Sequence, residues 1–234
     1  LFYLNHTELF EKTLKRLEET LKNPKIPDDD NIASLSFLYV YSNKLNLRFM
    51  KGDFSNGDPL VEKIQKKIKK YGSRIDGHHI MIFYYKIASL YFGDGNYQRC
   101  IEFLNKIIDN KSLEMREDLM CFSRILSLVA HYEAGKDYHL ESLIKSTFKY
   151  LIKMNDMHEV QKEMIKFLRN LSEVSPLEIK DEFRKLHSTL KPLENHPYER
   201  RAFLYLDILS WLESNIENRP VAEIIAEKAK LVSR

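Results

Sequence analysis

The loop at residues 52–58 is the stretch that most resembles a metal site, because its side chains are rich in oxygen. Calcium prefers oxygen ligands, and its common twelve-residue loop needs glycine at the sixth position and glutamate at the twelfth. Counted from Asp53, the glycine falls at the fifth position as Gly57, and the twelfth residue is Ile64. We therefore expect a turn between two helices here and no calcium site.

Eight histidines and two cysteines are the other residues whose types suit metal binding or catalysis. The histidines are scattered, and His158-Glu159 lacks the second histidine, four positions on, of a zinc-protease motif. Neither a phosphate-binding glycine loop nor a nucleophilic serine motif occurs. Cys100 and Cys121 lie in apolar helical patterns, which favours core positions. The sequence therefore predicts no enzyme activity, no metal and no cofactor.

Residues 63–71 form the most basic stretch of the chain. A basic run favours nucleic acid when aromatic side chains alternate with the cations and stack on bases. Here Leu60, Ile64, Ile68 and Tyr71 repeat at helical spacing as one apolar stripe, and lysines occupy the rest of the helix. A solvated outer helix face explains the pattern, so we do not expect a nucleic-acid partner.

Three glycines, each followed closely by an aromatic residue, divide the chain into amphipathic helical stretches. They are Gly52 before Phe54, Gly95 before Tyr97, and Gly135 before Tyr138. Glycine readily adopts the left-handed backbone with which a helix ends and the chain turns. The pattern predicts helical hairpins, and the expected helices are 7–22, 31–51 with 59–71, 78–92 with 96–110, 115–134 with 138–154, 157–172 with 176–191, and 198–214 with 220–232.

Polar residues and prolines at the helix starts support these boundaries. Short polar side chains can accept hydrogen bonds from the first free N–H groups of a helix, and proline is tolerated in the first turn. The expected start signals are the capping pair Asn5 and Glu8, the run Asp28-Asp29-Asp30 after Pro27, Asp58-Pro59, and the capping box Ser175-Pro176-Leu177-Glu178.

The segment 81–112 carries the most specific pattern, with aromatic, small and apolar residues at fixed offsets. They are Tyr84, Ile87, Ala88, Tyr91, Gly95, Tyr97, Cys100 and Leu104. In these positions the segment resembles a tetratricopeptide repeat. The other pairs resemble it more loosely, since their period is nearer 40 than the family's value of about 34, and Ser112 replaces the closing proline.

The resemblance implies that the first helix of each pair lines a concave groove and that residues beside its packing stripe contact a partner. In the matched repeat these positions are Ile82, Tyr85, Ser89 and Phe92. The looser alignments add Tyr39, Asn43, Asn46, Lys162, Arg169, Arg200, Phe203 and Asp207. Asparagine can pair with a peptide backbone, and aromatic rings can anchor a partner. The alternative is that Tyr85, Phe92 and Phe203 pack against neighbouring hairpins.

Composition agrees with a folded helical protein, at 44% hydrophobic and 30% charged residues with only seven glycines. The 37 basic and 34 acidic residues nearly balance, so no net field attracts nucleic acid or a membrane. The apolar stretch 80–92 contains Lys86 and is too short to span a bilayer. Two separate cysteines favour reduced thiols and a cytoplasmic location.

We therefore predict an all-α fold, a right-handed superhelix of stacked antiparallel helix pairs. One array covers residues 1–234, with five pairs after a leading helix, and we expect it to be part of a longer polypeptide. The predicted function is a protein-interaction scaffold that binds a peptide or partner segment in its concave groove. The alternative is a peptide-sensing regulatory module that controls an attached domain, for example a DNA-binding one.

Overall fold

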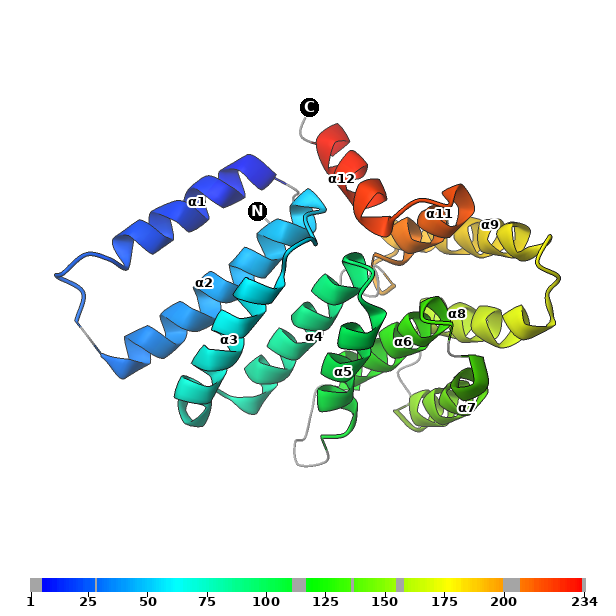
Figure 1. Cartoon of the computed structure of the whole chain (residues 1–234), viewed down its shortest axis with the longest axis horizontal. Coiled ribbons are helices and arrows are strands. Elements are labelled where there is room, and N and C mark those ends of the chain that lie inside the picture. Colours follow the sequence, from blue (N-terminus) through cyan, green and yellow to red (C-terminus); the bar gives the residue numbers. More distant parts are fainter. Residues whose placement is uncertain are drawn as a thin grey trace.

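The computed structural model describes residues 6–27, 29–110, 117–135, 137–154, 158–199 and 207–232, and these residues form helices without a strand (Figure 1). The α-helices are α1 (Thr7–Thr20), α2 (Asp30–Lys51), α3 (Asp58–Tyr71), α4 (Gly77–Gly93), α5 (Tyr97–Ile108), α6 (Glu117–Glu133), α7 (Asp137–Met154), α8 (Glu159–Asn170), α9 (Ile179–Leu190), α11 (Ile208–Glu217) and α12 (Val221–Val232). Short 3-10 turns follow at Gly72–Arg74, Leu171–Glu173 and Lys191–Asn195. The predicted all-α class is confirmed.

The helix starts follow the sequence signals at α2 but not at α9. The Asp29 carboxylate accepts hydrogen bonds from the N–H groups of Asn31, at 2.7 Å, and Ile32, at 3.2 Å. The predicted capping box at residues 175–178 is wrong, because α9 begins only at Ile179 and residues 176–178 form a turn. The start of α9 lies after the predicted one because residues 176–178 form a turn first. Asn5 lies outside the described residues.

The three glycine turns have the backbone that the sequence predicted. Gly52, Gly95 and Gly135 have φ angles of 65°, 75° and 65°. At the middle turn the N–H of Asn96 donates to the carbonyl of Tyr91 at 2.9 Å, which satisfies one of the free carbonyls at the end of α4. A left-handed residue is what makes this hydrogen bond possible.

The core is continuous from α2 to α11, and its best-packed part is the α4–α5 hairpin. Ile87 and Leu104 are fully buried, and Tyr91 is nearly so. Tyr84 and Ile108 are partly buried and pack against this core. Between α2 and α4 the rings of Phe37 and Phe83 stack with centroids 5.0 Å apart. Aromatic packing therefore fixes the spacing of these two helices.

The last helices turn back across the earlier ones. Trp211 of α11 packs edge-on against Phe183, and its indole N–H donates to the Glu133 carboxylate at the end of α6, at 2.6 Å. In Figure 1, α12 lies beside the C-terminal end of α2. A Cβ built on Gly52 would lie 2.6 Å from the backbone nitrogen of Ala226 in α12. The described array is therefore closed by a contact between helices near its two ends.

Candidate binding face on α2 and α4

The residues predicted to bind a partner through α2 lie together on one side of that helix. Asn43 and Asn46 are partly buried, and Tyr39 leaves 62% of its surface exposed. The Asn43 amide donates to the backbone carbonyl of Tyr39 at 2.8 Å, and the Asn46 amide donates to the Asn43 side-chain oxygen at 3.3 Å. Spacings of three and four residues place these side chains on one helix face.

Lys86 of α4 completes this arrangement. Its ammonium donates to the Ser42 hydroxyl at 2.6 Å and to the Asn46 side-chain oxygen at 2.8 Å. The chain of amides therefore turns the Asn46 oxygen toward the cation. We refer to Tyr39, Ser42, Asn43, Asn46 and Lys86 as the Lys86 face.

The Lys86 face holds a positive charge that has no carboxylate partner among the described residues. Within the described residues no carboxylate lies within ion-pair distance of the Lys86 ammonium, although most other cations on these helices have one. Burial lowers the pKa of Lys86 to about 8 from its ordinary value of 10.5. The side chain is still largely protonated at neutral pH, because its pKa lies above 7. The face therefore presents a cation whose charge is poorly solvated.

The matched repeat contributes less to this face than its resemblance implied. Ile82 and Ser89 are partly buried, and the Ser89 hydroxyl donates to the Tyr85 carbonyl at 3.0 Å. Tyr85 and Phe92 are each only 4% exposed. Both rings are therefore part of the core. Phe92 meets Tyr97 of α5 edge to face, with ring centroids 5.5 Å apart.

The remaining predicted partner residues lie on α8 and at the start of α11. Lys162 is exposed and pairs with Glu159 at 3.1 Å, and Arg169 is exposed near the end of α8. Asp207 is the N-cap of α11, where its carboxylate accepts from the N–H of Ser210 at 3.0 Å. This role in helix capping was not predicted for it. Arg200 and Phe203 lie outside the described residues.

Lys86 is the residue that the sequence interpretation passed over. It appeared there only as the charge that interrupts an apolar stretch. A single lysine within the apolar stretch 80–92 was the available signal, because a charge at such a position must find polar neighbours or stay partly solvated. Its neighbours come from α2, about 40 positions earlier, so spacing along α4 does not reveal them.

The arrangement that most resembles a catalytic pair joins α11 to α12. The Lys228 ammonium donates to the Ser210 hydroxyl at 2.9 Å, whereas a general base would accept the proton of the serine nucleophile. Ser210 is fully buried and donates its own proton to Asp207 at 2.7 Å. The Glu213 carboxylate forms an ion pair with the Lys228 ammonium at 2.6 Å. These side chains therefore connect α11 to α12.

Metal-binding and thiol chemistry have no assembled site in the part of the chain that the structure describes. Among those residues, no three His, Cys, Asp or Glu side chains are grouped so that they could hold a metal ion. Cys100 and Cys121 are both buried free thiols, and burial raises the pKa of Cys100. A thiol held protonated in the core is a poor nucleophile.

None of the described helices has both the length and the apolar character needed to cross a membrane. No protein-family model, curated protein or solved structure matches the chain. The argument for function therefore rests on the Lys86 face and its surroundings.

Proposed function

We propose that this chain is a cytoplasmic protein-interaction scaffold, arranged as a tetratricopeptide-like right-handed superhelix, and that its Lys86 face binds an extended segment of a partner protein. The observation that carries the proposal is the Lys86 ammonium, whose two partners are the neutral oxygens of Ser42 and Asn46. The proposal further specifies that the bound segment carries a carboxylate.

The hydrogen-bonding capacity of Lys86 supports a carboxylate ligand. A lysine ammonium has three N–H donors, and Ser42 and Asn46 accept from two of them. A partly buried cation without a counter-ion is costly, so a ligand that supplies the missing negative charge gains more than it would from an exposed lysine. An acidic side chain or a terminal carboxylate can fill both needs.

The rest of the face suits an extended peptide. The exposed Tyr39 ring offers an apolar surface with a polar tip, which is the kind of side chain enriched at protein interfaces. Asn43 and Asn46 each keep unused donor or acceptor capacity beyond the hydrogen bonds they make to each other and to Lys86. Free amide groups can pair with the backbone N–H and C=O groups of a bound strand.

A selection from a random peptide library tests this function without a known partner. We expect the native protein to enrich peptides that contain Asp, Glu or a free terminal carboxylate. Lys86→Met keeps most of the length of the side chain but removes its charge, and it should weaken the binding of the enriched peptides by about tenfold or more. Lys66→Met on α3 is the matched control, because it removes a lysine charge from an exposed surface. The Lys66 side chain is 81% exposed, and its ammonium lies 4.0 Å from the Glu62 carboxylate.

Two outcomes would contradict the proposal. One is enrichment of peptides without any acidic group. The other is an equal loss of affinity in the Lys86 and Lys66 variants, because that result would place the working surface on the outer basic helix α3.

The second candidate function is peptide sensing that controls an attached domain, and the contact of α12 with Gly52 favours it. Gly52 follows the last turn of α2, the helix that carries Asn43 and Asn46. A shift of α2 on peptide binding can therefore move α12, because the two backbones are in direct contact at Gly52. Hydrogen exchange of α12 amides, measured with and without a selected peptide, separates the two functions. Altered exchange in α12 favours the sensor, and unchanged exchange favours the scaffold.

A further inference from the structure

A cavity of about 430 Å³ that is largely open to solvent lies between the end of α1, the first half of α2 and the last turns of α3. Its apolar wall includes Phe37 and Val40, which are buried, together with Ile32, Ala33 and Tyr41, which are partly buried. A volume of this size is within the range of small-molecule sites, about 300–1,000 Å³. None of its lining residues belongs to the Lys86 face.

The cavity exists because α1 covers only the second half of α2. Phe10 and Leu14 of α1 pack against Met50 and Leu47, near the C-terminal end of α2. Figure 1 shows α1 and α2 diverging toward the loop that joins them, and this loop passes through Pro27. Leu21, Ile26 and Pro27 of this loop line the cavity but leave space beside the first half of α2.

The acidic groups of the lining are already engaged. The Glu18 carboxylate lies 2.5 Å from the ammonium of Lys44, and the Asp29 carboxylate caps α2. Lys22 and Lys67 also line the cavity, and within the described residues neither has a carboxylate within ion-pair distance. The charge available to a ligand in this cavity is therefore positive.

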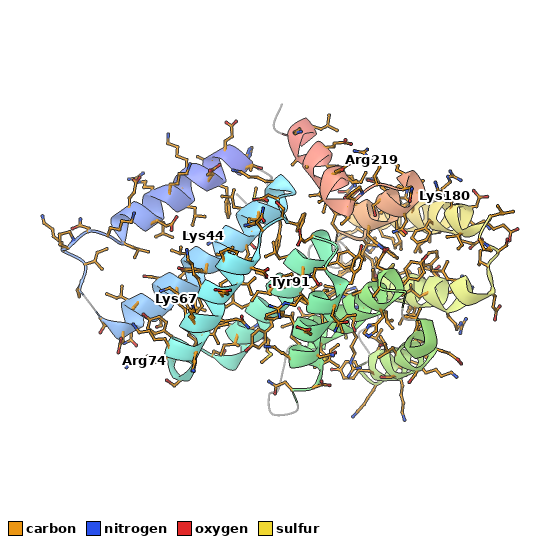
Figure 2. All side chains as sticks on the ribbon, in the orientation of Figure 1. Lys44, Lys67, Arg74, Tyr91, Lys180 and Arg219 are labelled. Atoms are coloured by element: carbon orange, nitrogen blue, oxygen red, sulfur yellow. The ribbon has the colours of Figure 1, made fainter. Side chains whose placement is uncertain are left out.

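Lys67 is held over aromatic rings. Its ammonium lies 5.5 Å from the ring centroid of Tyr41, 5.6 Å from that of Tyr71 and 6.0 Å from that of Phe37. Figure 2 labels Lys67 on α3 and Lys44 on the neighbouring helix α2. Attraction between a cation and the faces of aromatic rings positions the ammonium at the cavity without neutralising its charge.

The surroundings add to the same sign of potential. Helix α3 carries five lysines and two acidic residues, and one of the acidic groups, Asp58, accepts a hydrogen bond from the Tyr91 hydroxyl at 2.5 Å. Concentrated charge of one sign beside an apolar cavity attracts ligands of the opposite sign. The basic face of α3 therefore favours an anionic ligand in the adjacent cavity.

We propose that this cavity binds a small organic anion with a flat aromatic body. The ring lies against the wall formed by Phe37, Val40 and Tyr41, and the anionic group pairs with Lys67. This site goes beyond the proposed partner binding and is independent of it.

Naphthalene derivatives that share a ring but differ in charge test the proposal. The probes are naphthoate, the neutral naphthamide and the cationic naphthylmethylammonium, and affinity is measured by calorimetry with aromatic NMR resonances locating the site. We expect naphthoate to bind more tightly than naphthamide by about fivefold or more, as a partly screened ion pair allows. Lys67→Met should lower naphthoate affinity to that of naphthamide and leave naphthamide binding unchanged.

Two further variants control for surface charge and for location. Lys66→Met removes a lysine from the exposed side of α3 and should change naphthoate affinity by less than about twofold, because exposed charges are well screened. Ser36→Trp places a large ring at the cavity wall and should abolish binding. Thermal unfolding shows whether each variant still folds cooperatively, and Lys67→Met alone suffices if Ser36→Trp does not fold.

Several results would overturn the inference. Tighter binding of naphthylmethylammonium than of naphthoate would make the three rings a cation site. Equal naphthoate affinity in the native protein and Lys67→Met would show that the anion is not recognised there. If a folded Ser36→Trp variant binds naphthoate as well as the native protein does, the binding site is not in this cavity. If the native protein binds no naphthoate at millimolar concentration, the cavity is not a site for such anions.

Discussion

Lys86 on α4 and Lys228 on α12 each have a serine hydroxyl as one partner, and they differ in the second partner. Each ammonium donates to a serine hydroxyl, Ser42 at 2.6 Å in the first case and Ser210 at 2.9 Å in the second. The second partner of Lys86 is the neutral Asn46 oxygen at 2.8 Å, whereas that of Lys228 is a carboxylate oxygen at 2.6 Å. Among the described residues, the charge of Lys228 therefore has a carboxylate counter-ion, and the charge of Lys86 has none.

The comparison separates a lysine that has a carboxylate counter-ion from one whose partners among the described residues are neutral. The carboxylate beside Lys228 belongs to Glu213 of α11, so the ion pair joins two helices. The same carboxylate group lies 3.1 Å from His187 of α9, which extends the contact to a third helix. Within the described residues, Lys86 joins α2 to α4 through the neutral acceptors Ser42 and Asn46.

The largest predicted effect concerns the contact that brings these two regions together. Gly52 has a φ of 65°, and a Cβ there would lie 2.6–2.8 Å from backbone atoms of Ala222 and Ala226 in α12. Gly52→Val should destabilise the protein by about 3 kcal/mol or more, because strain in the left-handed backbone adds to an overlap that no side-chain rotation relieves. Urea unfolding measures the change.

Gly95 provides the matched control for that substitution. Its φ is 75°, but a Cβ there would have no neighbour within 4 Å. Gly95→Val should therefore cost only the backbone term, about 1–2 kcal/mol. Equal losses in the two variants would show that α12 does not pack on Gly52 in solution.

The next prediction removes each of the two compared lysines. Lys86→Met should raise the free energy of unfolding at pH 7 by about 1 kcal/mol, since it removes a partly buried charge without a counter-ion. Lys228→Met should lower it by about 1 kcal/mol, since the Glu213 carboxylate loses its closest partner. A change of the same sign in both variants would contradict the distinction between the two regions.

The pH dependence of stability sharpens this test. The pKa of Lys86 is about 8 in the folded protein, below its ordinary value of 10.5, so the unfolded chain binds more protons between these values. The contribution of Lys86 therefore makes the folded state more stable as pH rises from about 8 toward 10.5, where the penalty for its charge disappears. Lys86→Met should lack this increase.

The helical framework could be predicted from the sequence because its signals are local. Apolar residues at helical spacing and the left-handed glycines at positions 52 and 95 act over a few residues, and the structure shows the predicted turns there. The return of α12 to α2 could not be predicted, because it depends on Gly52 meeting alanines about 170 positions away. Small residues give no sign in the sequence of which backbone will approach them.

The candidate site was predictable only in its α2 half. Asn43 and Asn46 were expected from the offsets that the repeat resemblance implies, but the cation beside them comes from α4. Tyr85 and Phe92 occupied the expected offsets and proved to be buried, since an offset does not specify how closely the next helix packs. Contacts between helices decide which side of each helix remains open.

The smallest expected change in stability comes from making the two regions alike. Asn46→Asp places a carboxylate beside Lys86, where Lys228 already has Glu213. It should stabilise the protein by less than about 1 kcal/mol, because the gained ion pair is offset by the cost of a second partly buried charge. NMR titration of the lysine ammonium should show the pKa of Lys86 rising toward its ordinary value of 10.5.

The same Asn46→Asp substitution should abolish selection of acidic peptides, because the internal carboxylate pairs with the cation that they would bind. If acidic peptides still bind the Asn46→Asp protein with native affinity, Lys86 is not their receptor, and its neutral surroundings serve only to join α2 to α4.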